Sequence, residues 1–350
     1  MNNLWQCLPV PERQASVQAT AREKNIDDRA VEKDWWVTVI LKALFNTECG
    51  PFLLFKGGTS LSKGWGLIQR FSEDIDIAID RKFYRDVLGY SFAAGESNSQ
   101  LMRLRKVSRD YIHGTLSNAL EAKLKEYGVS GFTIRNVTEI IGSEGPRPID
   151  HDSDPTVINV FYSSLFPEYS GDIEACVKIE ISCLSMDEPF EDRLINSLIN
   201  QKFKDTDTDS SAKVRTVKPS RTFLEKCFLL NEEFQKRNPR SRRMSRHLYD
   251  IEKIMDTDYG KEALTDPSLY KSIVEHRRKF YHLGYVNYDS DYPDKIDFVP
   301  AGEILAAFRR DYNDNMVNGY IYGEAIDFDR VMRRIADLRE RFRNMSFDSE

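Results

Sequence analysis

Residues 52–80 read FLLFKGGTSLSKGWGLIQRFSEDIDIAID, two apolar runs that are joined by a glycine-rich turn, the second of them carrying two aspartates. The first run, 52–56, is short and bounded by glycine and proline, which predicts a buried strand. A short helix is expected at 60–67 and a returning strand at 70–80. The stretch therefore predicts a strand, a turn, a helix and a second strand that fold as one element.

The turn itself, KGGTSLSKGWG at 56–66, holds four glycines, three hydroxyl side chains and two lysines. Small residues let backbone N–H groups approach a phosphate, and hydroxyls and lysines add donors and charge. The spacing differs from that of a Walker A loop and from that of a dinucleotide-binding loop. The composition alone thus predicts an anion site of another kind.

The second run places Asp74 and Asp76 on one face of a strand and three isoleucines on the other. Two such carboxylates repel by about 4 kcal/mol at 4 Å in an effective dielectric of 20, unless a cation lies between them. Mg²⁺, or Mn²⁺ in its place, is the expected occupant, because it binds few carboxylates and completes its shell with water and phosphate. The alternative is a solvated pair of surface acids.

A third acid, Glu180, lies in VKIEIS at 177–182, where the same alternation separates Val177, Ile179 and Ile181 from the polar positions. If this strand lies beside the first, Glu180 joins the two aspartates. Three carboxylates of this kind are typical of a two-metal site, which acts on the attacking and leaving oxygens of a phosphoryl transfer.

The bulk composition argues against a generally basic nucleic-acid-binding protein, a membrane protein and a disulfide-linked protein. The 350 residues carry a net charge of −6, with a sequence pI near 5.6, so a polyanion would have to bind a local basic patch. No apolar run is long enough to cross a bilayer, and the N-terminus lacks the layout of a signal peptide, so we expect a cytoplasmic protein without membrane contact. The five cysteines are scattered, which predicts reduced thiols packed as small apolar groups.

The pattern along the chain predicts a mixed α/β (α+β) region followed by a mainly helical one. Strands are expected at 131–141, 156–164 and 176–182, and helices at 29–45 and 97–127. Residues 202–221 are polar and suit a surface connection, so we expect two domains, 1–210 and 211–350. The helices expected in the second domain are 221–236, 245–256, 268–281, 301–311 and 324–343.

The segment FKGGTSLSKGWGLIQRFSEDIDIAI resembles the first motif of the nucleotidyltransferase-like AbiEii/AbiGii toxin family, a branch of the DNA polymerase β-type nucleotidyltransferases. VEKDWWVTVILKALF (31–45) is similar to the family's E-K-D-aromatic helix, and VKIEIS to its third-acid strand. FLEKCFLLNEEFQKR and SRHLYDIEKI, at 223–237 and 245–254, resemble its later lysine and aspartate motifs. The match covers about residues 30–255.

The resemblance implies a polymerase β-like mixed sheet with flanking helices, and a toxin of a toxin–antitoxin or abortive-infection (phage defence) system with an antitoxin encoded beside it. It implies that Asp74, Asp76 and Glu180 bind the metal, with NTP as substrate, and that Lys226 and Asp250 are catalytic. The residues expected to bind the nucleotide are Gly57, Gly58, Thr59, Ser60, Lys63, Arg70 and Ser72. In the family, phosphorylation of a serine at the place of Ser72 can restrain toxicity, which the added negative charge beside the acids would explain.

Two of these residues have simpler readings from the pattern alone. Lys226 lies on the flank of an apolar helix stripe and could reach past its neighbours to solvent. Asp250 could be an exposed helical acid paired with Arg246, an interaction of about 0.3 to 0.5 kcal/mol.

The segment QKRNPRSRRMSRH at 235–247 has six lysines or arginines and no acid, and it lies between Lys226 and Asp250. It predicts contacts to RNA phosphates through Arg237, Arg240, Arg242, Arg243 and Arg246. The expected reaction is transfer of a nucleoside monophosphate to RNA, with the tRNA acceptor end as the first substrate to test. The alternatives are nucleotidylation of a small molecule or a protein hydroxyl, and a non-catalytic module that senses nucleotides or binds a partner.

Overall fold

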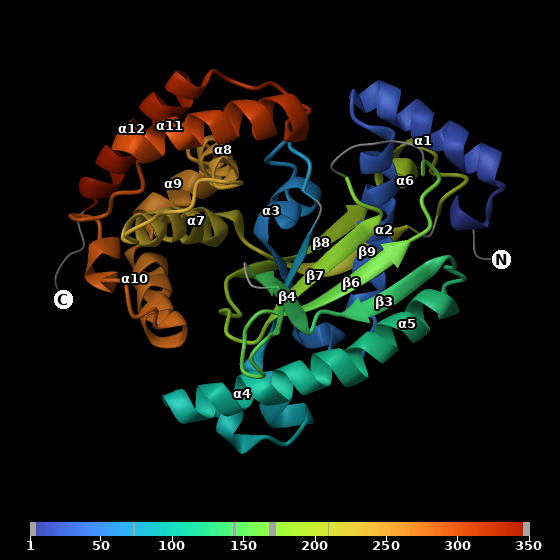
Figure 1. Ribbon diagram of the computed structural model, residues 1–350, viewed down its shortest axis with the longest axis horizontal. Helices are drawn as coiled ribbons and strands as arrows, with labels where there is room; N and C mark the ends of the chain where they lie inside the picture. The colour runs from blue at the N-terminus through green and yellow to red at the C-terminus, as the bar shows by residue number, and fades with distance from the viewer. Residues whose placement is uncertain (1–4, 73, 143–144, 168–172, 209, 346–350) are drawn as a thin grey trace. The chain divides into compact units, whose positions relative to one another are not determined.

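The computed structural model describes residues 5–72, 74–142, 145–167, 173–208 and 210–345 (Figure 1). The chain divides into two compact units. The N-terminal unit comprises Met1–Gly64 and Glu73–Thr216, and the C-terminal unit comprises Trp65–Ser72 and Val217–Glu350. The eight residues 65–72, which lie in sequence between the glycine turn and the two aspartates, thus belong to the C-terminal unit.

The N-terminal unit is built on a mixed seven-stranded sheet in the order β3-β6-β7-β2-β1-β9-β8. The pairs β2–β7 and β1–β9 are parallel, and β1–β2, β3–β6 and β6–β7 are antiparallel. This confirms the predicted mixed α/β class. The strands are β1 (Leu53–Lys56), β2 (Ile75–Ile79), β3 (Phe132–Asn136), β6 (Thr156–Tyr162), β7 (Cys176–Ser182), β8 (Phe190–Asn196) and β9 (Ser211–Val217), with a separate hairpin of β4 (Glu139–Gly142) and β5 (Gly145–Pro148).

Helix α2 (Asp28–Phe45) contributes a large part of the core of this unit. Asp27 caps its first turn by accepting a hydrogen bond from the backbone of Arg29, and α2 contacts β7. Trp35 and Trp36 are almost completely buried, and Trp36 stacks on Tyr162 of β6 with ring centroids 4.8 Å apart. Core packing, and not base stacking, is therefore the role of these two tryptophans.

The other helices of the N-terminal unit complete its core. Helix α5 contacts both α2 and β3, and α1 contacts α2. They are α1 (Val10–Lys24), α4 (Asn98–Tyr111), α5 (Ser117–Glu126) and α6 (Leu198–Lys202), with short turns α3 (Gly57–Thr59), η1 (Trp5–Cys7), η2 (Gly50–Phe52), η3 (Ser60–Gly64), η4 (Phe83–Val87), η5 (Ser91–Ala94) and η6 (Ile112–Leu116).

The C-terminal unit is helical, as predicted. Its last helix, α12, buries Val331, Ile335, Leu338 and Phe342 along one stripe. Several arginines of its outer face pair with acids, as Arg334 does with Glu252, so this helix has a charged surface. The elements are α7 (Pro219–Phe234), α8 (Ser245–Ile254), α9 (Asp258–Thr265), α10 (Pro267–His276), η7 (Arg277–Tyr281), η8 (Tyr288–Asp291), α11 (Gly302–Asp311), η9 (Tyr312–Tyr320) and α12 (Phe328–Arg343).

Four expectations are wrong. The single strand expected at 131–141 is divided into β3 of the main sheet and β4 of the separate hairpin. The strand expected at 70–80 begins only at Ile75, because the preceding backbone pairs within the C-terminal unit: Phe71 N–H donates to the Tyr320 carbonyl at 2.7 Å. The connection expected at 202–221 contains β9, whose alternating buried positions are small or β-branched and were therefore overlooked. Cys7 is exposed, whereas the other four cysteines are buried thiols.

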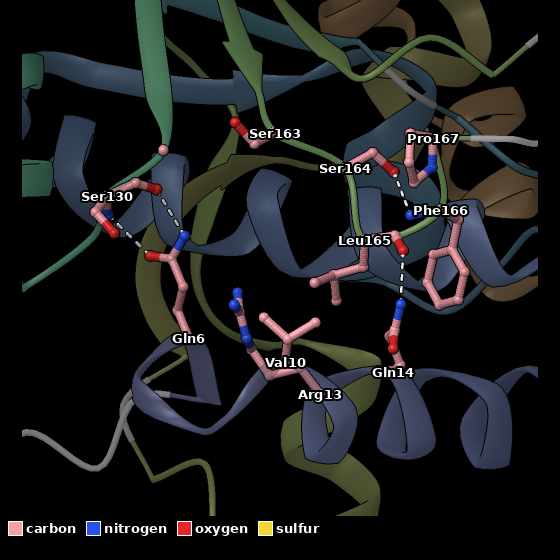
Figure 2. Close-up of a pocket in the computed structure, with 11 residues that line it drawn as sticks. Gln6, Val10, Arg13, Gln14, Ser130, Ser163, Ser164, Leu165, Phe166 and Pro167 are labelled. Carbon is pink, nitrogen blue, oxygen red and sulfur yellow. Dashed lines mark hydrogen bonds between the residues drawn. The ribbon is translucent and has the colours of Figure 1, made fainter.

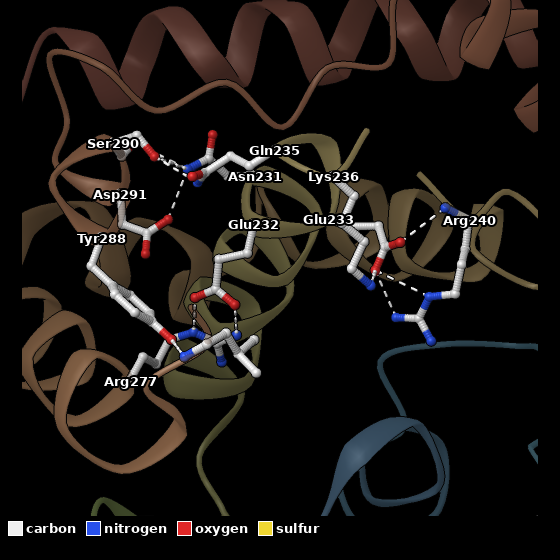
Figure 3. Close-up of polar contacts among 11 residues, drawn as sticks. Asn231, Glu232, Glu233, Gln235, Lys236, Arg240, Arg277, Tyr288, Ser290 and Asp291 are labelled. Carbon is white, nitrogen blue, oxygen red and sulfur yellow. Dashed lines mark hydrogen bonds and ion pairs between the residues drawn. The ribbon is translucent and has the colours of Figure 1, made fainter. Parts of the chain in front are cut away.

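A buried acidic pair lies in the core of the C-terminal unit (Figure 3). Glu232 of α7 accepts two hydrogen bonds from the Arg277 guanidinium, at 2.5 Å each. Asp291 accepts a hydrogen bond from the Asn231 amide at 2.7 Å, and its Oδ2 is buried without a hydrogen-bond partner in the described part of the chain. Burial, reinforced by the negative charge of Glu232, raises the pKa of Asp291 to about 7.

We expect the stability of the protein to fall between about pH 4 and pH 7 through Asp291, the range between its unfolded and folded pKa. A carboxyl whose folded pKa is raised contributes most stability below its unfolded pKa and loses it as pH rises through the folded pKa. Asp291→Asn should remove this slope and be more stable than the wild type at pH 8, by roughly 2 to 4 kcal/mol. Urea denaturation across this pH range and at pH 8 measures the effect, with exposed Asp294→Asn as the control. A slope retained in Asp291→Asn would contradict the assignment.

Candidate functional site

The three acids come together through the register of two central strands. Strands β2 and β7 are parallel neighbours, and Asp76 lies directly opposite Glu180. Asp74 immediately precedes β2, and all three acids are half-buried. Their flanking isoleucines, Ile75, Ile77, Ile179 and Ile181, are fully buried on the other face of the sheet, as the alternation predicts.

Lys178 supplies the positive charge on this face. Its ammonium forms an ion pair with Glu180, two residues along the same strand. Although burial opposes the charged form, Glu180, Asp74 and Asp76 together raise the pKa of Lys178. Among the residues that the structure describes, no group of three or more acidic, histidine or cysteine side chains is arranged around a metal position. A lysine thus balances the carboxylates where a cation is expected.

The glycine turn is fitted against the same acids. Gly57 has a φ of 76°, and a Cβ at this position would overlap the Asp76 carboxylate. Only glycine lets the backbone approach so closely. The Thr59 hydroxyl donates to the Asp74 carbonyl, and the Ser60 hydroxyl donates to the Gly57 carbonyl at 2.9 Å. Both hydroxyls are buried and hold the turn, a structural task that the sequence did not indicate.

Lys63, within the glycine turn, contacts helix α2. Its ammonium pairs with Asp34, whose other oxygen accepts a hydrogen bond from the backbone of Leu198 at 2.7 Å. Asp34 belongs to the E-K-D-aromatic segment, and its position explains why an acid stands there. Gly58, next to the turn, is buried.

We expect Gly57→Ala to destabilise the N-terminal unit more than Gly89→Ala does. Both glycines have a φ of 76°, so both substitutions carry about 1 kcal/mol of backbone strain. A Cβ at Gly89 meets nothing within 4 Å, whereas one at Gly57 meets Asp76, which should add roughly 1 to 3 kcal/mol. Urea denaturation of the two variants measures the difference. Equal losses would mean that the turn does not constrain Asp76.

A second cluster, in the C-terminal unit, joins three of the other predicted residues. The Arg70 guanidinium donates to both Asp250 oxygens at 2.7 Å, and the Lys226 ammonium lies 2.9 Å from the same carboxylate. Asp250 is completely buried. Burial would raise the pKa of Asp250, but the two cations hold it well below its usual range. The reading of Asp250 as an exposed acid paired with Arg246 is wrong.

This cationic cluster (Arg70, Lys226 and Asp250) has one more positive than negative side chain. Burial, together with the charge of Arg70, lowers the pKa of Lys226, and the attraction of Asp250 opposes that change. Lys226 is 7% exposed, so the reading of a lysine that reaches past its neighbours to solvent is also wrong. A buried group of this charge favours an anion.

His247 was missed by the sequence analysis. It is buried beside the cationic cluster, and its Nδ1 has no hydrogen-bond partner among the described residues. Burial, followed by the charges of Lys226 and Arg246, lowers the pKa of His247 well below its usual value, so the imidazole is neutral. Its position within the basic segment, three residues before Asp250, could have indicated that His247 lies near the predicted site.

The basic segment connects α7 to α8. Arg240 is tied to Glu233 through its backbone and its guanidinium, with an Nη2–Oε2 distance of 2.7 Å (Figure 3). The backbone of Arg243 donates to Asp311 at 2.6 Å. Ser72, from the glycine-turn side of the sequence, is half-buried in the same unit. Of the five arginines expected to contact RNA, four are exposed and Arg246 is half-buried: Arg237, Arg240, Arg242, Arg243 and Arg246.

We expect Asp250→Asn to destabilise the C-terminal unit by about 3 to 5 kcal/mol, because it leaves two buried cations without their carboxylate. Asp329 provides a matched control in the same unit. It also pairs with both sides of an arginine, Arg309, but these side chains are 55% and 41% exposed. Asp329→Asn should therefore change the urea midpoint little. Similar midpoints for the two variants would contradict the structural role of Asp250.

No helix in the described part of the chain combines the length and apolar character that crossing a membrane requires. A comparison with curated protein sequences gives no match. Among solved structures, the nucleotidyltransferase toxin MenT4 from Mycobacterium tuberculosis H37Rv is similar, with a TM-score of 0.49 and 15% identity over 95% of this chain and 91% of that chain.

The family model described as nucleotidyl transferase AbiEii toxin, type IV toxin–antitoxin system, matches residues 39–334. This range begins inside the 30–255 over which the motifs show the resemblance and ends well beyond it, and it includes all the residues expected to bind metal, nucleotide or RNA. The chain belongs to the AbiEii family: it is a nucleotidyltransferase and the toxin of a type IV toxin–antitoxin system.

Proposed function

We propose that this enzyme transfers a nucleoside monophosphate from an NTP to RNA in the cytoplasm, with the tRNA acceptor end as the first acceptor to test, and that the transfer inhibits growth or blocks phage. The observation that carries the proposal is the register that sets Asp76 opposite Glu180, with Asp74 beside them and Gly57 against Asp76. Type IV toxins have a cognate antitoxin, which would restrain this activity. Because the family is one of enzymes, the non-catalytic alternative is abandoned.

We assign a divalent ion to the three carboxylates on the chemistry of their oxygen donors. Nucleotidyltransferases of this type generally use NTP and a divalent metal. Asp74, Asp76 and Glu180 offer hard oxygen donors from two adjacent strands, which suit Mg²⁺ or Mn²⁺. When bound, such ions lower the negative charge that an attacking hydroxyl meets at the α-phosphate and stabilise the leaving pyrophosphate. Lys178 would then release Glu180 and remain as a nearby positive charge.

The other residues of the N-terminal unit position the triphosphate. Backbone N–H groups of Gly57 and Gly58 offer donors to phosphate oxygens where a side chain cannot intervene. Thr59 and Ser60 act by fixing the turn through their hydrogen bonds to Asp74 and Gly57. Lys63 supplies positive charge, held in place by Asp34.

The C-terminal unit supplies anion binding of its own. We assign Arg70 and Lys226 to phosphate charge, with Asp250 holding both in position. Ser72, two residues after Arg70, adds a hydroxyl. The exposed arginines of the basic segment would bind the RNA backbone without reading its sequence, so binding should weaken steeply with salt.

In the transfer step, the RNA hydroxyl oxygen forms a bond to the α-phosphorus, and the bond from that phosphorus to the α,β-bridging oxygen breaks. The hydroxyl proton passes to Glu180, the acid opposite Asp76, and pyrophosphate leaves with the electron pair of the broken bond. The RNA gains one nucleotide and a free terminal hydroxyl.

We expect Asp76→Asn to lower label transfer from an α-phosphate-labelled NTP to total RNA by at least about 100-fold, because it removes a central oxygen donor. Asp86→Asn, an exposed acid of the same unit, should keep full activity. Both variants should keep the wild-type circular dichroism and urea midpoint. Each NTP is tested in turn, and the labelled product is treated with ribonuclease.

Transfer that continues in Asp76→Asn would refute the catalytic assignment. Label that resists ribonuclease would instead identify a protein or a small molecule as the acceptor. Lys226→Met separates the two units' contributions: it should raise KM for NTP and leave the Mg²⁺ dependence of the remaining activity unchanged.

A further inference from the structure

A cavity of about 610 Å³ lies in the N-terminal unit, between the start of α1 and two loops that end β6 and precede β3 (Figure 2). None of its lining residues belongs to the glycine turn or to the acids of β2 and β7. Its size is typical of pockets that hold small organic ligands. Its side chains divide into a polar set, Gln6, Arg13, Gln14, Ser130, Ser163 and Ser164, and an apolar set, Val10, Leu165, Phe166 and Pro167.

The walls of the cavity are held by hydrogen bonds. The Gln6 amide donates to the Ser130 carbonyl at 2.7 Å and accepts from the Ser130 N–H at 3.0 Å. On the other side, the Gln14 amide donates to the Leu165 carbonyl at 2.9 Å. These bonds tie both loops to the N-terminal segment, so the cavity is formed before any ligand arrives.

Arg13 is the charged side chain in the lining of this cavity. Its side chain projects from α1 toward the cavity (Figure 2), and its Nε is buried. In the described part of the chain, this Nε has no hydrogen-bond partner; the guanidinium lies 5.8 Å from the centroid of the Trp5 ring, and its charge acts on Glu32. Arg13 is half-buried, so its guanidinium can offer donors to a ligand that enters the cavity.

The nearest buried acid does not meet that need. Glu32 accepts hydrogen bonds from the Ser164 hydroxyl at 2.7 Å and from the Leu165 N–H at 2.8 Å, so each of its oxygens already has a donor. Glu32 lowers the local positive potential, but it accepts no hydrogen bond from the Arg13 guanidinium. A ligand could therefore bind Arg13 without displacing a hydrogen bond within the protein.

We propose that this cavity binds a small organic monocarboxylate, with the carboxylate on Arg13 and its apolar body against Val10, Leu165 and Phe166. One arginine and no lysine line the cavity, which matches a single negative charge better than a phosphate or a triphosphate. A planar carboxylate also fits the two parallel donors of a guanidinium. The site is independent of the proposed transfer reaction and takes another class of ligand.

The probe is 3-phenylpropanoate, titrated against the full-length protein with binding followed by isothermal calorimetry and ligand-observed NMR. We expect a Kd below about 1 mM, binding of the neutral 3-phenylpropanamide at least about tenfold weaker, and binding of inorganic phosphate weaker still. Arg13→Gln should weaken carboxylate binding at least about tenfold. Arg22→Gln changes an exposed arginine of the same helix and should leave binding unchanged.

Arg13→Lys keeps the charge and removes the fork, so it should fall between the wild type and Arg13→Gln if the bidentate contact matters. Circular dichroism and the urea midpoint establish that each variant is folded, and saturation-transfer contacts from the phenyl ring to Phe166 locate the ligand. The proposal is overturned by the absence of binding up to about 10 mM, by equal affinity of acid and amide, by tighter binding of phosphate, or by wild-type affinity in a folded Arg13→Gln.

Discussion

Repulsion among carboxylates is the constraint on which the rest of the N-terminal unit depends. Asp74, Asp76 and Glu180 are brought to one face of two neighbouring strands by the same alternation that buries the isoleucines. The sheet cannot bury its apolar face without gathering the acids on the other. A positive charge is therefore required there, and Lys178 provides one in the protein alone. The fold thus gathers negative charge on one face as a consequence of its core.

The glycine turn adds a steric condition to this electrostatic one. Gly57 lies so close to Asp76 that a methyl group would displace the carboxylate, and the hydroxyls of Thr59 and Ser60 lock the backbone of the turn. The small residues therefore have two proposed tasks: to leave N–H groups accessible to phosphate and to fix the acid that would hold the metal. Composition alone suggests the first of these tasks and not the second.

The sequence predicts helices and strands correctly where the period of apolar residues is clear. It does not predict side-chain partners that lie far apart in the chain. Strand β7 has the predicted bounds, because its alternation is strict. The partner of Arg70 could not be predicted: it lies 180 residues away, and the segment that carries Arg70 folds with the C-terminal unit, whereas Asp74 does not. Strand β9 was overlooked because its buried positions include Ala212 and Thr216, which do not form an apolar run.

The surroundings of Arg13 differ from those of three buried arginines. Arg70 and Arg277 each place a guanidinium on both oxygens of a buried carboxylate, and Arg221 donates to Glu225 one turn along its helix. These three buried arginines thus have acids supplied by the chain. Arg13 has Trp5 beneath it and a cavity in front of it, and the nearest carboxylate is already engaged by Ser164 and Leu165. Arg13 is half-buried and faces the cavity, and the acceptor that we propose for it is a molecule that the chain does not provide.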